Sequence, residues 1–391
     1  MRKILVTAAL GAGLIAGGAA AQDLKIVLIA GKTGPLEAYA KQTEEGLKLG
    51  FEYATQGKMT IDGRKIVLIV KDDQTKPDVA KTLLQQAYED DKADIAIGTT
   101  SSAAALAMLP VAEEFKKILL VEPAVADQIT GDKWNRYIFR TARNSSQDAI
   151  SNAVASDVPG LSLCMLAQDY AFGRDAVKAF KEALKKAKIV HEEYLPVNTS
   201  DFTAGGQRLI DALKDKPGRK IIYFYWAGAG NPLKVADMDL KRYNIEVAAG
   251  GNILPAMVAY KPYAGMEGAT YYYFGLPKNP VNEWLVANHY TKFKSPPDFF
   301  TAGGMSAGIA LVEALKKTNG DTSTDKLIAA MEGMSFMSPK GKMTFRKEDH
   351  QAMQSMFHTR IKNDPAFAWG VPELVREIKP EEMDVPIKNK R

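Results

Sequence analysis

The chain alternates short, continuously apolar runs with longer amphipathic stretches, and this alternation restricts its fold more than any other feature. The run LKIVLIA (24–30) is followed by LEAYAKQTEEGLKLGFEYA (36–54) and then by RKIVLIVKD (64–72). Unbroken runs of Ile, Val and Leu are typical of parallel strands buried on both faces, and stretches with a helical apolar period cover such strands. The sequence therefore predicts an α/β protein with a doubly wound parallel sheet.

The same alternation continues to about residue 243 and contains more strands than one sheet holds comfortably. Further strands are expected at 93–100, 117–124, 160–168, 188–196 and 219–228. Further helices are expected at 77–91, 102–115, 146–156, 173–187, 203–215, 231–243 and 305–318. The chain can pass to a second sheet near YIFRTARNSS and return near GATYYYFGLP. We therefore expect two interleaved lobes, 22–142 plus about 276–350 and 143–275 plus about 351–391, joined by a hinge that can open and close.

The first 21 residues have the pattern of a secretory signal, with a basic start, an apolar stretch over 4–16 and three alanines before Gln22. The apolar stretch is interrupted by glycines and is too short to span a bilayer, so an uncleaved anchor is the less favoured alternative. No cysteine follows the three alanines, which removes the thiol that a lipid anchor needs. We expect a soluble protein of the periplasm.

Composition excludes several classes of protein. Apolar residues make up 46% and charged residues 25% of the chain, so neither disorder nor a multi-spanning membrane protein fits. The net charge is +5, and basic residues alternate with acidic ones, so we expect no nucleic acid partner. The four histidines lack the paired spacing of zinc sites, and the single Cys164 lies in an apolar run. We therefore expect no metal, no cofactor and a buried, inert thiol.

Candidate ligand-binding residues follow the predicted strands, at the turns that lead into the next helix. Ligands of open α/β sheets bind at the carboxyl ends of parallel strands. Ser101 and Ser102 stand before an alanine-rich helix, where their hydroxyls and the free backbone N–H groups could hold a carboxylate. Simple capping of the helix by one serine is the alternative. Pro123 and Ala124 follow the next strand and leave room for a ligand.

Aromatic residues occupy several of the same turns and could sandwich a flat or apolar ligand. They are Tyr39, Tyr170, Phe172, Tyr225 and Trp226. For each of them, packing in the core is the alternative interpretation.

The order and spacing of these segments resemble the periplasmic solute-binding proteins of ABC importers, specifically the branched-chain amino-acid (Leu/Ile/Val) binding family. The resemblance extends from about Leu24 to Gln354. The segments on which it rests include GKTGPLEAYAKQTEEGLKLGFEYA, IAIGTTSSAAALAMLPVAEE, LLVEPAVADQIT, YIFRTARNSSQDA and AQDYAFGRDA. It implies a type I clamshell of two Rossmann-like lobes with three crossings, which delivers its ligand to a permease with ATPase subunits. We expect a monomer.

The resemblance also assigns roles to individual residues. Ser102, with Ser101 adjacent, matches the serine that binds the ligand carboxylate; Ala124 matches a main-chain contact, and Tyr39 matches the tyrosine of the first loop.

Several positions depart from the amino-acid binders of this family. Ala126 replaces a threonine, Phe172 replaces a tyrosine, and Gly251 or Asn252 replaces the acidic residue that neutralises the α-ammonium. A bound ammonium without a carboxylate partner is costly to desolvate. We therefore expect a cleft that recognises a negative head group and offers no counter-charge to a positive one.

Arg143 lies at the crossover between the lobes and could pair bidentately with a ligand carboxylate, with a hinge salt bridge as the alternative. Together with Phe172, Tyr225, Trp226 and Tyr170, it leads to the hypothesis of an aromatic acid of the benzoate, cinnamate or p-coumarate type. A branched-chain amino-acid or amide-binding protein is the alternative within the same class.

An enzyme is the alternative from a different class. The segment GMSAG (304–308) has the G-x-S-x-G pattern of a nucleophile elbow around Ser306, with Asp349 and His350 downstream. Two prolines break the stretch before it, so no convincing strand leads into it, and small residues for close helix packing are the preferred interpretation. A ligand-sensing regulatory domain is disfavoured because no DNA-binding or signalling module is attached.

Overall fold

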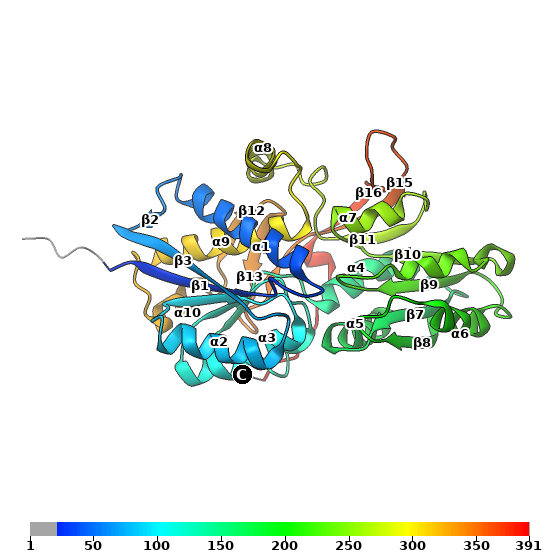
Figure 1. Cartoon of the computed structure of the whole chain (residues 1–391), viewed down its shortest axis with the longest axis horizontal. Helices are drawn as coiled ribbons and strands as arrows, with labels where there is room; N and C mark the ends of the chain where they lie inside the picture. The colour runs from blue at the N-terminus through cyan, green and yellow to red at the C-terminus, as the bar shows by residue number, and fades with distance from the viewer. Residues whose placement is uncertain (1–21, 391) are drawn as a thin grey trace, which may run out of the picture.

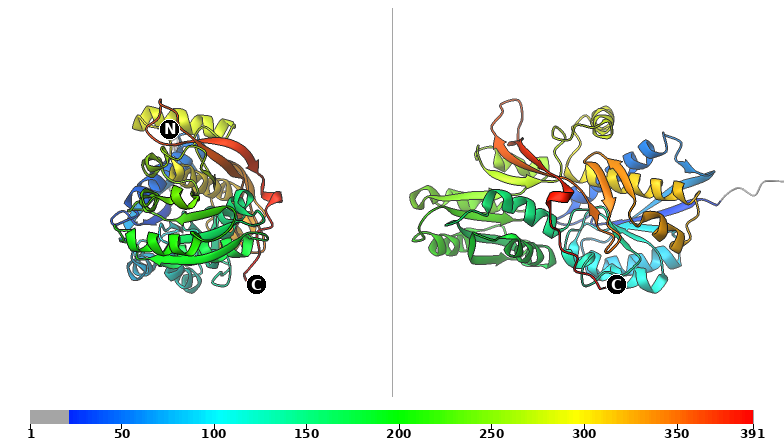
Figure 2. Two further views of the ribbon diagram at one scale, coloured as in Figure 1. Left: turned by 90° about the vertical axis from the view of Figure 1, so that its right-hand side faces the viewer. Right: turned by 180° about the vertical axis from the view of Figure 1, so that it is seen from behind.

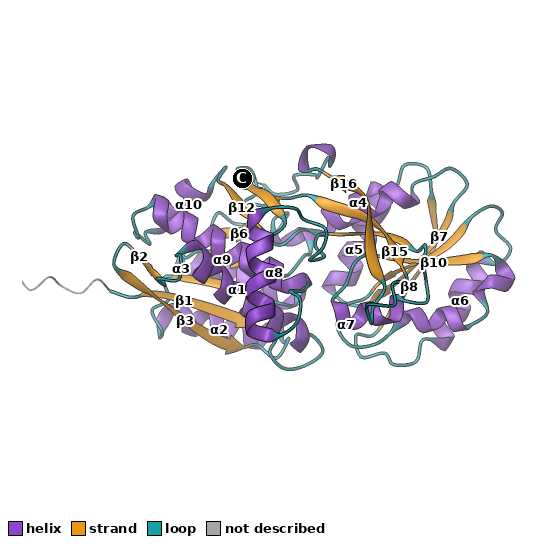
Figure 3. Ribbon diagram, turned by 90° about the horizontal axis from the view of Figure 1, so that it is seen from above, coloured by secondary structure: helices purple, strands orange, loops and turns teal. Residues whose placement is uncertain are grey.

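The computed structural model describes residues 22–390, and these residues form two α/β lobes that lie side by side along the long axis (Figure 1). Elements from the first third of the chain and from 280–353 build the first lobe. The middle of the chain and two late strands build the second (Figure 3). The signal expected at 1–21 lies outside the described residues. Among those described, no helix combines the length and the apolar character needed to cross a membrane.

The first lobe is built on a six-stranded sheet. From edge to edge its strands are β2 (Thr60–Ile61), β3 (Arg64–Asp72), β1 (Leu24–Ala30), β4 (Ile95–Gly98), β5 (Leu119–Val121) and β6 (Ile138–Arg140). All neighbours pair in parallel except β2, which forms an antiparallel hairpin with β3. Leu24, Ile26 and Leu28 of β1 belong to one apolar cluster and Val27 and Ile29 to another, so the sheet is covered on both faces.

Helices cover both faces of this sheet. They are α1 (Glu37–Ala54), α2 (Pro77–Glu89), α3 (Ser102–Phe115), α9 (Phe299–Lys317) and α10 (Thr324–Met331). Helix α8 (Pro280–Phe293) packs outside α1, with the Trp284 ring 5.1 Å from that of Tyr53. Figure 1 shows α1 and α9 on one side and α2 and α3 on the other. A Cβ on Gly304 of α9 would lie 2.2 Å from the carbonyl oxygen of Thr43 in α1, so the two helix backbones touch where glycine stands.

The second lobe repeats this plan with a four-stranded parallel sheet. Its strand order is β10 (Ile245–Ala249), β9 (Lys220–Tyr225), β7 (Ser162–Gln168) and β8 (Lys188–Leu195). Its helices are α4 (Ser145–Ser156), α5 (Ala171–Ala183), α6 (Thr203–Leu213) and α7 (Leu254–Met257). Short 3₁₀ turns are η1 (Asp127–Ile129), η2 (Pro232–Asp237), η3 (Leu240–Tyr243), η4 (Val258–Tyr260) and η5 (Pro380–Glu382).

Two small antiparallel sheets complete the lobes and carry the chain between them. One consists of β11 (Glu267–Thr270), β15 (Met356–Lys362) and β16 (Val371–Ile378), the other of β12 (Ser335–Ser338), β13 (Gly341–Phe345) and β14 (Ala352–Met353). The chain crosses between the lobes after β6, after β11 and between β14 and β15. The expected clamshell with two Rossmann-like lobes and three crossings is therefore confirmed.

One helix predicted from the sequence is interrupted in the structure. The helix expected at 231–243 is divided into η2 and η3, because Asp239 adopts a left-handed conformation with φ 57° between them. At the end of the chain, the tail that follows η5 runs back along the first lobe (Figure 2). Lys388 bonds to Asp127 of the first lobe and to Glu182 of the second, and Asn389 bonds to the carbonyl oxygen of Glu348.

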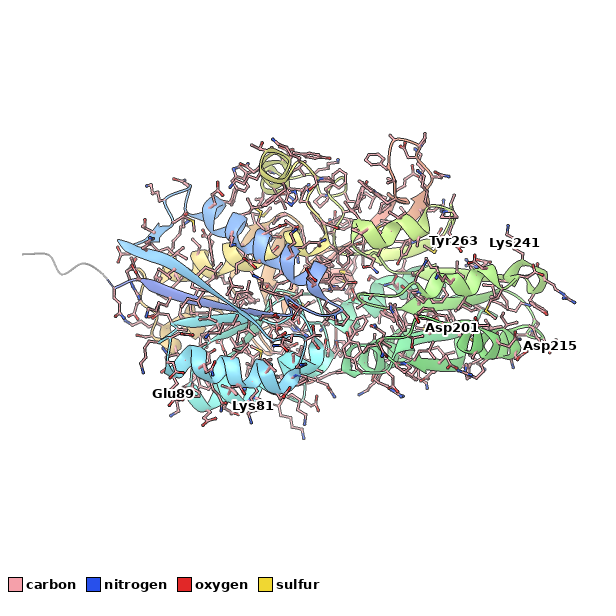
Figure 4. The ribbon with its side chains drawn as sticks, viewed as in Figure 1. Lys81, Glu89, Asp201, Asp215, Lys241 and Tyr263 are labelled. Atoms are coloured by element: carbon pink, nitrogen blue, oxygen red, sulfur yellow. The ribbon has the colours of Figure 1, made fainter. Side chains whose placement is uncertain are left out.

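Charged side chains of both signs project from the outer faces of both lobes (Figure 4). Lys81 and Glu89 lie on the exposed side of α2, and Asp201, Asp215 and Lys241 lie at the surface of the second lobe. In these regions, the interleaved charged residues of the sequence therefore lie on the solvated surfaces of helices and loops.

Candidate functional site

A cleft lies between the two lobes, at the carboxyl ends of the parallel strands of both large sheets. Its empty space is about 780 Å³, part of which is open to solvent. Clefts between domains are common positions for small-molecule sites. Nine of the ten predicted site residues line it: Tyr39, Ser102, Ala124, Arg143, Tyr170, Phe172, Tyr225, Trp226 and Asn252. The tenth, Ser101, does not.

The two adjacent serines have different roles in the structure. Ser101 is the N-cap of α3, and its Oγ accepts a hydrogen bond from the Ala104 amide at 3.5 Å. Ser102 Oγ accepts from the backbone N–H groups of Val125 and Ala126, both at 3.3 Å. Because the Ser102 oxygen accepts twice, its own hydroxyl hydrogen is left to donate into the cleft. Capping thus accounts for one serine and leaves the other at the site.

Arg143 forms a salt bridge, as the alternative interpretation held. Its Nε donates to Asp148 Oδ1 at 3.1 Å, and both side chains are largely buried. The guanidinium also stacks over the rings of Tyr271 and Phe299, with centroid distances of 4.6 and 5.3 Å. Among the described residues, its Nη1 and Nη2 have no hydrogen-bond partner. These N–H groups of Arg143 therefore stay available to an anion, while Nε holds the hinge pair.

The expectation of a cleft without a counter-charge for a positive group did not include Asp148, whose carboxylate lines the cleft and is paired with Arg143. Burial raises the pKa of the Asp148 carboxyl, and the neighbouring Arg143 guanidinium offsets part of that effect. From the sequence, the position of an ammonium partner is expected at Gly251 or Asn252, and Asp148 falls inside a predicted helix. Its position five residues after Arg143, on the first turn of α4, was the available signal.

Tyr39 joins the two lobes across the cleft. It lies on the first turn of α1, and its hydroxyl accepts from the Gly228 amide at 2.8 Å and donates to Asn252 Oδ1 at 3.1 Å. Burial raises the pKa of Tyr39 to about 12, so the phenol stays protonated and keeps its donor. Asp298, the N-cap of α9, makes a second contact between the lobes, because its Oδ2 accepts from the Leu254 amide at 2.9 Å.

Aromatic side chains from both lobes enclose the cleft. Tyr170 is the N-cap residue of α5, and Phe172 packs edge-on against Tyr225 with ring centroids 6.3 Å apart. From the first lobe, the Phe300 ring lies 4.4 Å from that of Tyr39. Four further aromatic residues line the cleft that were not predicted from the sequence: Phe224, Tyr260, Phe299 and Phe300. Phe299 and Phe300 belong to the first turn of α9, in the stretch that had been treated as a proline-broken segment.

A buried charged cluster lies beneath the cleft at the crossings. Burial raises the pKa of Glu122, whose carboxylate accepts from Thr141 Oγ1 at 2.9 Å. Burial lowers the pKa of Lys340 to about 8, although Glu122 counteracts this. The Lys340 ammonium donates to Gln354 Oε1 at 2.6 Å and stands 4.8 Å from the Tyr271 ring centroid. Residues from three distant segments thus hold the hinge through polar contacts.

The nucleophile-elbow interpretation of 304–308 is wrong. Ser306 lies in the middle of α9, is fully buried, and donates to the carbonyl oxygen of Ala302 at 2.7 Å. His350 bonds to Ile138 and Glu332, and Asp349 bonds to Arg346. Each of the three proposed triad members is therefore engaged elsewhere.

Over 22–390, no cluster of three or more His, Cys, Asp or Glu residues is arranged to hold a metal ion. Cys164 is buried in β7, and burial raises its pKa to about 12, so its thiol stays protonated.

Comparison with known proteins gives consistent matches over most of the chain. Residues 23–366 match the family model described as "Periplasmic binding protein". A crystal structure described as an ABC-type branched-chain amino acid transporter from Rhodopseudomonas palustris CGA009 is 70% identical. It covers 94% of this chain and 100% of its own, with a TM-score of 0.83.

Two more distant relatives differ in the ligand that their names suggest. An ABC transporter solute-binding protein from Rhodopseudomonas palustris BisB5, solved in complex with 3,4-dihydroxybenzoic acid, is 28% identical. It covers 93% of this chain and 99% of its own, with a TM-score of 0.80. The Leu/Ile/Val-binding protein homolog 6 of Brucella abortus is 23% identical over 370 residues, which are 91% of this chain and 92% of that protein.

Proposed function

Because the chain belongs to the periplasmic binding protein family and is a solute-binding protein of an ABC transporter, we propose that its ligand is a small carboxylate, and specifically an aromatic acid of the benzoate or cinnamate type. The ligand lies between the lobes and is passed to a membrane permease driven by ATPase subunits. The protein acts as a soluble monomer in the periplasm. No bond of the ligand is made or broken.

The set of hydrogen-bond donors in the cleft is the observation that carries this proposal. Ser102 keeps a hydroxyl hydrogen for a ligand, and Arg143 keeps its Nη groups. Charge-assisted bonds from such donors to a carboxylate are among the strongest in proteins. The one acidic lining residue, Asp148, is already paired with Arg143. The unpaired donors of Ser102 and Arg143 are therefore suited to an anion.

The residues that line the cleft favour a ligand whose carboxylate is attached to an aromatic group. Flat rings of Tyr170, Phe172, Tyr260 and Phe300 face the space between the lobes, and a planar ligand buries its faces against them. The relative with 28% identity was solved with 3,4-dihydroxybenzoic acid, which fits this description.

An amino-acid ligand is the second candidate, and one observation favours it. Asp148 provides a carboxylate in the cleft that an α-ammonium group could share with Arg143. The name of the relative with 70% identity also refers to branched-chain amino acids. The pairing of Asp148 with Arg143 argues against this candidate, because an ammonium would have to compete with the guanidinium.

Closure of the lobes couples binding to transport. Ser102 belongs to the first lobe and Arg143 to the crossing into the second, so a carboxylate that touches both completes its contacts only when the lobes are together. Contacts made only in the closed state shift the population toward it.

Isothermal titration of the mature protein with benzoate, 3,4-dihydroxybenzoate, cinnamate, p-coumarate and leucine tests the proposal. We expect heat of binding from at least one of the four aromatic acids and none from leucine. Saturable binding of leucine with silent aromatic acids would replace this proposal with the second candidate.

A further inference from the structure

Tyr225 ends β9 inside the cleft, and its hydroxyl has no hydrogen-bond partner in the described part of the chain. Only 7% of the residue is exposed. A buried donor without a partner is costly, and natural structures keep few of them. A missing partner at the edge of a binding cleft points to a group that arrives with the ligand.

The surroundings of this hydroxyl identify the kind of group. The charges of Asp148 and Arg143 reach Tyr225 and act on its pKa in opposite directions, while burial raises that pKa well above its usual value. The phenol is therefore a permanent donor next to the charged pair. No hydrogen bond joins it to Asp148, whose Oδ1 accepts from Arg143 Nε.

We propose that the Tyr225 hydroxyl donates a hydrogen bond to the ligand's carboxylate and forms, with Ser102 and Arg143, the three-sided site that holds it. This inference rests on the proposed function in requiring a carboxylate ligand, but it holds for an aromatic acid and for an amino acid alike. Ser102 approaches from the first lobe, whereas Tyr225 approaches from the second. The carboxylate is thus held from both lobes, and the ring of Tyr225 serves a second purpose as part of the aromatic wall.

Tyr223 provides a matched control on the same strand. Its hydroxyl is also buried without a partner in the described structure, and its ring lies 5.3 Å from that of Tyr225. Tyr223 does not line the cleft. Replacement of either tyrosine by phenylalanine removes one unpaired hydroxyl and keeps the ring, so both variants should fold as well as the wild type.

Titration of the wild type, Tyr225→Phe and Tyr223→Phe with benzoate, cinnamate, p-coumarate and leucine tests the proposal. For every one of these carboxylates that the wild type binds, we expect Tyr225→Phe to weaken binding about 10- to 100-fold and Tyr223→Phe to leave it unchanged. Equal affinities of Tyr225→Phe and the wild type would overturn the proposal. So would equal losses in the two variants, since these would indicate a packing effect of the strand.

Benzoate and cinnamate have no ring hydroxyl, so the carboxylate is the one polar group through which they can bind the Tyr225 hydroxyl. A loss in Tyr225→Phe that appears with p-coumarate and is absent with cinnamate would place the Tyr225 hydroxyl on the ring substituent and overturn the assignment. A wild type that binds leucine alone contradicts the aromatic-acid function but still tests Tyr225. A wild type that binds none of the four carboxylates contradicts both.

Discussion

The hydroxyl of Tyr39 in the first lobe lies 2.8 Å from the amide nitrogen of Gly228 in the second, and it donates at 3.1 Å to Asn252 of the same lobe. These bonds exist only while the lobes are together. We therefore expect Tyr39→Phe to weaken ligand binding by about 1–2 kcal/mol, or about 5- to 30-fold, because the closed state loses them. Titration calorimetry measures this loss. Tyr290→Phe, on the exposed face of α8, is the control and should bind like the wild type.

Substitutions of the two adjacent serines should have different effects, one on ligand affinity and the other on the free energy of unfolding. Ser102→Ala removes a donor to the ligand and should weaken carboxylate binding by about 1–3 kcal/mol. Ser101→Ala removes the cap of α3 and should lower the free energy of unfolding by about 1 kcal/mol without changing affinity. Thermal unfolding and titration of both variants check this, and a loss of affinity in Ser101→Ala alone would move the anion site.

Asp148→Asn distinguishes the two candidate ligands. A carboxylate ligand should bind as well as in the wild type or about 3- to 10-fold tighter, because a like charge near it is removed. An amino acid should lose its ammonium partner and bind far more weakly. Asp169→Asn, in a half-exposed pair with Arg174, is the control for removing an ion pair elsewhere. Weaker binding of an aromatic acid by Asp148→Asn alone would contradict the role assigned to Arg143.

Asp298 should make stability depend on pH. Burial raises its pKa from 3.8 to about 6, although the amides of Phe299 and Leu254 and the side chain of Gln42 act to lower it. Between about pH 4 and 6 the folded state therefore binds the proton that the unfolded state has released. Its contribution to stability is greatest at low pH and falls, by about 1–3 kcal/mol, as pH rises through 6.

Urea denaturation of the wild type and Asp298→Asn at pH 4 to 7 measures this contribution. The difference in unfolding free energy between the two proteins should change between about pH 4 and 6 and then stay constant up to pH 7. A constant difference from pH 4 to 7 would show that the Asp298 pKa is not raised.

The contact between α1 and α9 leaves no room for a side chain at Gly304. Gly304→Ala would place a Cβ 2.2 Å from the Thr43 carbonyl oxygen, so the helices must separate, and we expect a loss of about 1–3 kcal/mol or more in unfolding free energy. Ser306→Ala removes only a hydroxyl bonded within its own helix and should change stability little and ligand binding not at all. Thermal unfolding of the two variants compares them.

The sequence was most informative where periodicity was strong. The runs at 24–30 and 64–72 have the same bounds as β1 and β3, because each strand has an uninterrupted centre of Ile, Val and Leu. The short antiparallel strands β12 to β16 were not predicted, since two to eight residues with one exposed face leave little pattern. The segment at 231–243 has helical spacing, yet the left-handed Asp239 interrupts it.

The site was predictable to the extent that it lies at strand ends. Tyr39, Ser102 and Tyr225 follow from that rule, and all three line the cleft. Asp148 could not be singled out, because a helical carboxylate is ordinary surface unless a partner such as Arg143 is known to lie beside it. The lobe boundaries and the ligand-binding role of each residue stay predictions.

The contact between α1 and α9 also constrains when the protein can fold during its synthesis. On the ribosome, α1 emerges long before residues 299–317, so the face of α1 that packs against α9 has nothing to cover it for most of translation. The first lobe can reach its native packing only after nearly the whole polypeptide has been synthesised. A nonsense mutation anywhere before residue 299 should therefore yield an aggregation-prone fragment rather than an independently folded half.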